Sequence, residues 1–270
     1  MSGDRLAACF ARCAEGHRSA LIGYLTAGDP NPEISEKALC ALAEYVDIIE
    51  IGMPFSDPMA DGPVIQAASE RALAAGTHMD DVFRLATIVR RAQPDIGIAL
   101  MGYANVPYTM GFEHFAERAA ASGVDGVLMV DIPPEESAIC DAALKANGLH
   151  NIRLLSPTSS DERIQLATSD ASGFIYYVSL TGITGAEMGK AEEVKKKLAS
   201  IRHYTNLPVC VGFGVKTPEQ AREVAEFAEG VVIGSHFVMQ ITENMADSSA
   251  IVEAVTRQAQ SMRMAVSKAV

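Results

Sequence analysis

The sequence has 270 residues, of which 49% are hydrophobic and 21% are charged. These proportions are ordinary for a globular protein with a sizeable core, and they exclude a disordered chain. The formal net charge of -12 argues against nucleic acid or an anionic membrane surface as the main partner. A small phosphorylated substrate stays possible, because backbone N–H groups and helix N-termini bind phosphate without any basic patch.

The cysteines form no C-x-x-C pair and no zinc-like cluster with histidine, so we expect free thiols in a reducing compartment. They are Cys9, Cys13, Cys40, Cys140 and Cys210. Asp4, Arg5 and Arg12 interrupt any apolar run at the N-terminus, which argues against a signal peptide. No stretch approaches the roughly 18 apolar residues of a membrane span. We therefore expect a soluble, cytoplasmic protein.

Short apolar runs alternate with longer amphipathic segments along the chain. Several runs are apolar at both odd and even positions, as in parallel strands buried on both faces. The predicted strands are Ala20–Leu25, Asp47–Ile51, Ile96–Met101, Gly126–Val130, Ile152–Leu155, Phe174–Val178, Pro208–Val211 and Gly230–Ile233. The predicted helices include Pro32–Glu44, Met79–Ala92, Phe112–Ala121, Glu135–Ala146, Asp161–Ala167, Ala191–His203, Pro218–Phe227 and Ser248–Met264.

Strands that alternate with helices in this way favour an α/β fold, a closed (β/α)8 TIM barrel, over an open doubly wound sheet. Leu6–Ala14 predicts an extra N-terminal helix over the bottom of the barrel, and Phe237–Ile241 predicts a short extra helix after strand eight. Gly123 and Gly148 stand where helices should end. Because no linker or composition break occurs, residues 1–270 are predicted to form a single barrel domain.

Glu50 lies within the second apolar strand, near its C-terminal end, where barrel enzymes carry their functional residues. A carboxylate there is costly unless it is paired, hydrated or used. Apolar surroundings should raise its pKa, which suits a general acid or base. The alternative is an ion pair inside the barrel, for which the one basic candidate is Arg153, near the start of the predicted fifth strand.

The loop that follows, Met53–Pro63, contains three prolines and two aspartates, so its backbone is stiff enough to hold a carboxylate in place. Asp61 is the candidate, although its position just before Gly62-Pro63 is also that of a helix N-cap. Asp57 is equally suited to a turn. The pattern alone leaves these alternatives open.

Two glycine-containing loops follow strands seven and eight, at Gly212-Phe213-Gly214 and at Gly234-Ser235. Phosphate sites of barrels usually lie there, because glycine allows close backbone approach and a helix N-terminus adds partial positive charge. Tight turns are the alternative. The loop Ser179–Gly189, with three glycines, is predicted to be a mobile lid, or else a disordered surface connection.

The segment Glu50–Pro63 resembles the signature of the tryptophan synthase alpha chain family, and the motif is long and specific. The likeness continues through Thr26–Pro30, Leu100–Asn105, the Thr-Gly-Ile-Thr-Gly segment 181–185 and Gly212–Gly214.

This resemblance implies a lyase of tryptophan biosynthesis that cleaves indole-3-glycerol phosphate to indole and glyceraldehyde 3-phosphate in a retro-aldol reaction. Glu50 matches the family's catalytic glutamate, which protonates C3 of the indole and helps to deprotonate the side-chain hydroxyl. Asp61 matches the aspartate that hydrogen-bonds the ring N–H. Asp57 and Thr184 match loop positions involved in closure. The remaining matched positions are Tyr24, Tyr103, Tyr176 and Phe213 at the indole pocket, with Gly185, Gly214, Gly234 and Ser235 at the phosphate cradle.

The chemistry agrees with what the sequence lacks. A Schiff-base aldolase needs a lysine at a strand end, and none stands there. An indole-glycerol-phosphate-forming synthase, the nearest rival, would need one too. The six histidines are scattered over predicted helices and loops, so no metal site is expected. No cofactor is expected on this chain.

The resemblance also implies a partner, a tryptophan synthase beta subunit that carries pyridoxal phosphate, in an alpha2beta2 heterotetramer in which indole passes to the beta subunit to make L-tryptophan. Pro54–Ala60 and the lid are the predicted docking surfaces. A stand-alone indole-releasing lyase and a mainly regulatory partner stay open as alternatives. The sequence departs from the common family form at Tyr24, where phenylalanine is frequent, and at Leu180, where some members carry arginine.

Overall fold

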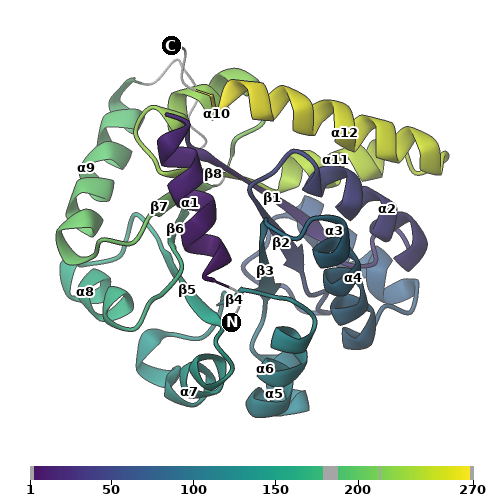
Figure 1. Cartoon of the computed structure of the whole chain (residues 1–270), viewed down its shortest axis with the longest axis horizontal. Coiled ribbons are helices and arrows are strands. Elements are labelled where there is room, and N and C mark those ends of the chain that lie inside the picture. Colours follow the sequence, from purple (N-terminus) through teal and green to yellow (C-terminus); the bar gives the residue numbers. More distant parts are fainter. Residues whose placement is uncertain (1–2, 179–187, 213, 268–270) are drawn as a thin grey trace.

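Eight parallel strands form a closed barrel in the computed structural model, which describes residues 3–178, 188–212 and 214–267 (Figure 1). Each strand pairs with the next in the chain, and β8 pairs with β1. The strands are β1 (Ala20–Thr26), β2 (Ile48–Gly52), β3 (Gly97–Gly102), β4 (Gly126–Met129), β5 (His150–Leu155), β6 (Ile175–Val178), β7 (Val209–Gly212) and β8 (Gly230–Ile233). The predicted (β/α)8 barrel is confirmed.

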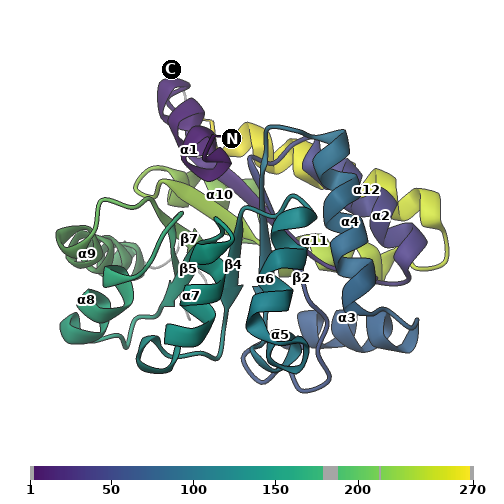
Figure 2. The same cartoon turned by 60° about the horizontal axis from the view of Figure 1, so that its bottom comes forward.

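Helices surround the barrel on its outside (Figures 1 and 2). Those that follow the strands are α2 (Pro32–Ala43), α3 (Pro63–Ala74), α4 (Met79–Ala92), α5 (Asn105–Met110), α6 (Phe112–Ala121), η1 (Pro134–Glu136), α7 (Ala138–Ala146), α8 (Asp161–Ser169), α9 (Met188–Tyr204), α10 (Pro218–Ala225), α11 (Ser235–Glu243) and α12 (Ser248–Ala265). No helix in the described ranges is both long and apolar enough to span a membrane.

The barrel strands are buried on both sides, which explains why they are apolar at successive positions. Inward-facing side chains such as Ile22, Ile48, Leu128 and Val232 pack together inside the barrel. The outward-facing side chains join the larger core between the sheet and the helices. The interior is therefore a packed core, and only its end is free to carry a site.

Helix α1 (Arg5–Glu15) lies across one end of the barrel (Figure 1), whereas α5 lies toward the other end (Figure 2). The buried residues Leu6, Cys9 and Cys13 of α1 pack on the barrel interior. The rings of Phe10 and Phe174 meet edge to face, with their centroids 5.9 Å apart. The predicted N-terminal helix is thus confirmed, and it closes the bottom of the barrel.

Carboxylates one residue before β2, β4 and β8 join neighbouring strands at the bottom of the barrel. Asp47 accepts the backbone N–H of Leu21 at 2.9 Å and binds the Arg18 guanidinium at 2.6 and 2.7 Å. Asp125 repeats this arrangement under β3 and β4, and Glu229 repeats it under β7 and β8. These ion pairs and hydrogen bonds stabilise the bottom of the barrel. Functional residues of such barrels lie at the opposite, C-terminal end of the strands.

Several boundaries differ from the prediction. The short helix after β8 runs over Ser235–Glu243 and so includes the predicted phosphate residue Ser235. Helix α9 starts at Met188, which makes the last two residues of the predicted loop Ser179–Gly189 helical. Helix α5 was not predicted, because its six residues are too few to show a periodicity.

Candidate active site

Glu50 lies on the inner side of β2, paired in register with Tyr24 of β1 and Ala99 of β3. Its side chain is buried, with 1% of the residue exposed. Among the described residues neither carboxylate oxygen has a hydrogen-bond partner. Burial therefore raises the pKa of Glu50 to about 8. At neutral pH this carboxyl keeps a proton that it can donate.

The alternative of an ion pair between Glu50 and Arg153 is not supported. Arg153 points out of the barrel, where its Nη2 donates to Asp141 and to Ser137, each at 2.5 Å. The structure describes no salt bridge to Glu50 within residues 3–178, 188–212 and 214–267. Among the described residues, no fixed positive charge therefore offsets the free-energy cost of burying this glutamate.

Asp61 lies in the loop between β2 and α3 and is partly buried. The N-cap residue of α3 is Gly62, so the capping role does not fall on the Asp61 side chain. Burial raises the pKa of Asp61, and the Tyr103 hydroxyl partly offsets that rise. Gln66 donates to the Asp61 carbonyl at 2.8 Å, and Ala60 N–H donates to the Tyr103 hydroxyl at 2.9 Å. These bonds fix the loop against α3 and the end of β3.

Tyr24 and Tyr176 point into the upper part of the barrel, and each hydroxyl lies over a glycine of the neighbouring strand. A Cβ atom on Gly52 would collide with the Tyr24 hydroxyl, and one on Gly212 would collide with that of Tyr176. The Tyr24 hydroxyl is 3.2 Å from Thr26 Oγ1. Glycine is therefore required at these two strand ends because a ring from the adjacent strand occupies the space of a side chain.

The two carboxylates and the tyrosines share one electrostatic environment. Burial is the main reason that the pKa of Tyr24 and of Tyr176 is raised, and the charges of Glu50 and Asp61 add to the rise in both. Tyr103 is affected in the same way by burial and by Asp61. The structure thus brings together five of the predicted site residues at the C-terminal end of the barrel.

The predicted phosphate loops lie at the same end of the strands. Gly214 follows β7 with a positive φ of 81°, which glycine adopts without strain. Gly234 is the N-cap of α11, and Ser235 is the first residue of that helix. Three further predicted residues, Phe213, Thr184 and Gly185, lie outside the described residues.

Asp57 stands apart from the other predicted residues. It is exposed on the β2–α3 loop, and the hydroxyl of Ser56 donates to its carboxylate at 2.5 Å. Sequence reasoning did not single out Gln66, which holds the Asp61 carbonyl. Its position five residues after Asp61, one turn into a helix, was the available signal.

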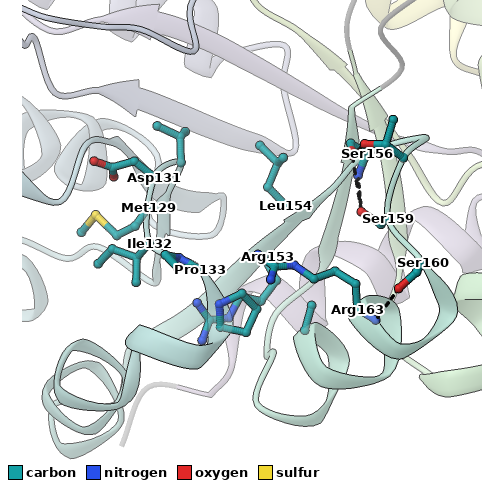
Figure 3. Close-up of a pocket in the computed structure, with 14 residues that line it drawn as sticks. Met129, Asp131, Ile132, Pro133, Arg153, Leu154, Ser156, Ser159, Ser160 and Arg163 are labelled. Carbon is teal, nitrogen blue, oxygen red and sulfur yellow. Dashed lines mark hydrogen bonds between the residues drawn. The ribbon is translucent and has the colours of Figure 1, made fainter.

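A cleft of about 660 Å³ opens beside the barrel end, between the loops after β4 and β5 (Figure 3). Asp131 and Leu154 line it, as do Arg153 and Arg163. Neither Glu50 nor Asp61 lines this cleft. Within the described ranges, no group of three or more His, Cys, Asp or Glu residues could hold a metal ion.

The sequence and the fold of this chain match those of known proteins. The family model of the tryptophan synthase alpha chain matches residues 10–267. The chain belongs to the tryptophan synthase alpha chain family. A tryptophan synthase alpha chain from Zymomonas mobilis is 46% identical over 259 residues, which cover 94% of each chain. One from Nitrosococcus oceani is 47% identical over 250 residues and 92% of each chain.

Solved structures agree with this membership. A tryptophan synthase alpha chain from Legionella pneumophila superposes with a TM-score of 0.89 at 37% identity, over 98% of each chain. A tryptophan synthase from Mycobacterium tuberculosis gives a TM-score of 0.87 at 31% identity, over 98% of this chain and 99% of that one.

Membership of the tryptophan synthase alpha chain family confirms the predicted family, the TIM barrel and a lyase of tryptophan biosynthesis. It favours the alpha-subunit role over a stand-alone lyase or a mainly regulatory partner. A tryptophan synthase alpha chain implies a small-molecule substrate and a beta-subunit partner, and the family is consistent with the absence of a cofactor on this chain.

Proposed function

We propose that this tryptophan synthase alpha chain cleaves indole-3-glycerol phosphate, with Glu50 as general acid and base and Asp61 as the residue that holds the ring. The observation that carries the proposal is the buried Glu50 carboxyl, whose pKa is raised to about 8 and which has no partner among the described residues. A proton donor of that pKa suits a reaction near neutral pH.

The reaction follows from these two carboxyls. Protonated Glu50 donates its proton to C3 of the indole ring, which places positive charge on the ring and its N–H. Asp61, ionised, accepts a hydrogen bond from that N–H and offsets the developing charge. Glu50, now a carboxylate, takes the proton of the side-chain hydroxyl. The carbon–carbon bond then breaks, its electrons restore the aromatic ring, and indole and glyceraldehyde 3-phosphate are released.

Aromatic rings suit the walls of an indole site, and we assign Tyr24, Tyr103 and Tyr176 to that role. The phosphate belongs at the N-terminus of α11, a nine-residue helix, where backbone N–H groups and partial positive charge are available. Gly214, Gly234 and Ser235 form that cradle in our proposal. Phe213, Thr184 and Gly185 stay predictions from the family resemblance.

We further propose that the chain joins a beta subunit carrying pyridoxal phosphate in an alpha2beta2 heterotetramer and passes indole to it. The loop Pro54–Ala60 at the mouth is the proposed docking surface, and its Met59 is 80% exposed, so an apolar side chain is available there for contact with a partner. Asp57 lies in the same loop and takes part in its closure. A cytoplasmic location and a single domain over residues 1–270 stay predictions.

An indole-release assay tests the proposal. The full chain is incubated with indole-3-glycerol phosphate, alone and with its cognate beta subunit, and indole and glyceraldehyde 3-phosphate are measured. We expect both products in equal amounts, with faster release in the complex. Absence of indole under both conditions contradicts the proposed reaction, and sedimentation of the mixture as separate subunits contradicts the heterotetramer.

A further inference from the structure

We propose that Arg71, together with Asp29 and Thr242, forms a strut that sets the distance between the two ends of the substrate site. Arg71 is a positioning residue, because it touches neither the ring end nor the phosphate end. The inference rests on the proposed function, which places the indole near Asp61 and the phosphate at α11.

The core of the strut is an ion pair between a buried carboxylate and a half-buried guanidinium. Asp29, in the loop after β1, is completely buried, with 0% of the residue exposed. Arg71 of α3 binds it with both arms of the guanidinium, Nε to Oδ1 at 2.7 Å and Nη2 to Oδ2 at 2.8 Å. Nη2 also donates to Thr242 Oγ1 of α11 at 3.1 Å. One planar side chain therefore joins the β1–α2 loop, α3 and α11.

Helix α3 connects this strut to the ring end of the site. Asp61 lies two residues before the first residue of α3, and Gln66 in the first turns of that helix holds the Asp61 carbonyl at 2.8 Å. Because an α-helix of twelve residues moves as a rigid rod, fixing α3 at Arg71 also fixes the backbone that carries Asp61.

Helix α11 connects the strut to the phosphate end. Thr242 lies in its last turn, and its hydroxyl donates to the Val238 carbonyl at 3.3 Å, so the oxygen that Arg71 reaches is itself held in place. Ser235 is at the other end of the same nine-residue helix. A shift of α11 along its axis would move the phosphate cradle by the same amount.

The β1–α2 loop, which carries Asp29, is held by further hydrogen bonds. Gly28 N–H donates to the Ser35 hydroxyl of α2 at 2.9 Å, and Asp29 N–H donates to the Thr26 carbonyl at 3.3 Å. These bonds hold the backbone that carries the Asp29 carboxylate, to which Arg71 is anchored. A lysine at position 71 would keep the charge but lose the fork that reaches Asp29 and Thr242 together.

The test compares Arg71→Lys with Thr242→Val, which removes only the hydroxyl and keeps the shape of the side chain. Both full-length variants are assayed with the cognate beta subunit, on indole-3-glycerol phosphate and on indole glycerol without the phosphate. We expect kcat/KM on the phosphorylated substrate to fall by about 10- to 100-fold in Arg71→Lys and by a smaller factor in Thr242→Val. For the substrate without phosphate, kcat/KM should fall much less, because that substrate does not depend on the distance between the ring end and the phosphate end of the site.

Arg84→Lys serves as the matched control, since Arg84 pairs with Glu36 at 2.7 Å on the surface between α4 and α2. Circular dichroism and thermal unfolding establish the folded fraction of each variant. A lower Tm with unchanged kcat/KM per folded molecule overturns the strut, as does an equal loss on both substrates. If Arg71→Lys does not fold, Thr242→Val decides alone. An unmodified chain that releases no indole overturns the proposed function instead.

Discussion

Tyr24 and Glu50 stand side by side in the register of β1 and β2, both on the inner side of the barrel. The ring of Tyr24 extends over Gly52, two residues beyond Glu50, so it covers the glutamate's strand from above. The carboxyl of Glu50 is thereby enclosed by the sheet and by a phenol ring, away from any fixed cation among the described residues. This enclosure keeps it protonated at neutral pH.

Replacing this carboxyl should abolish proton transfer and spare the fold. In Glu50→Gln the shape is kept but no proton can be donated, so we expect the rate of indole release to fall by about 10²- to 10⁴-fold. Circular dichroism should be unchanged. Glu33→Gln, on the exposed start of α2, is the matched control and should retain full activity. Near-normal turnover of the Glu50 variant would remove it as the general acid.

The pH profile of kcat/KM should report the same group. Because the active form of Glu50 is protonated and its pKa is about 8, activity should fall about tenfold per pH unit above that value. A separate loss is expected at acid pH, where Asp61 becomes protonated. Initial rates between about pH 4 and 10 are the measurement. A descending limb centred near the ordinary glutamate pKa, two or more units lower, would contradict the buried state.

Stability should depend on pH through the same carboxyl. Its folded pKa, about 8, exceeds its ordinary value of 4.5, so the unfolded state releases the proton first as pH rises. The contribution of Glu50 to stability is therefore fully present below 4.5 and is lost as pH rises through about 8. Urea unfolding over this range should show a steeper decline for the natural chain than for Glu50→Gln. Parallel curves would argue against the shift.

Asp61→Asn tests the second carboxyl. The amide keeps the size of the side chain but cannot balance positive charge on the ring, and removal of one such electrostatic contact costs about 10²- to 10³-fold in kcat. We expect KM to change far less than kcat, because the charge develops only on the way to the transition state. Steady-state kinetics on the complex measures both. A variant altered in KM alone would make Asp61 a simple binding residue.

Gly52→Ala should reveal how tightly Tyr24 is packed. The new methyl group collides with the Tyr24 ring and hydroxyl, and overpacking of this kind costs about 1–3 kcal/mol. Tyr24→Phe removes the nearest atom, so the double variant should recover part of the loss. Urea unfolding of the natural chain, both single variants and the double variant completes the cycle. Strict additivity would contradict the contact.

At the bottom of the barrel, Asp47→Ala should lower stability without changing catalysis. It leaves the Arg18 guanidinium and the Leu21 N–H without their shared acceptor, and loss of one partner from a buried pair costs about 3–5 kcal/mol. The free energy of unfolding and the kcat per folded molecule are measured together. A large drop in kcat would show that the two ends of the barrel are coupled.

Much of this architecture could be predicted from the sequence because it depends on local patterns. Strands such as Ala20–Thr26 are mostly apolar at successive positions, and helices such as Met79–Ala92 show a clear period and end signals, so strand count and barrel class follow. Glu50 was detectable for the same reason, as a carboxyl where the pattern demands an apolar residue. These signals lie within a few residues of one another.

The tertiary structure decided what each charged group faces. Arg153 is outside the barrel with Asp141, and Gly62 takes the capping position that Asp61 could have held. Arg71 meets Asp29 across 42 residues, a pairing that no local pattern contains. Side chains so far apart in the chain become neighbours only when the barrel closes and the helices settle on it, and that closure is what leaves Glu50 buried without a charge partner among the described residues.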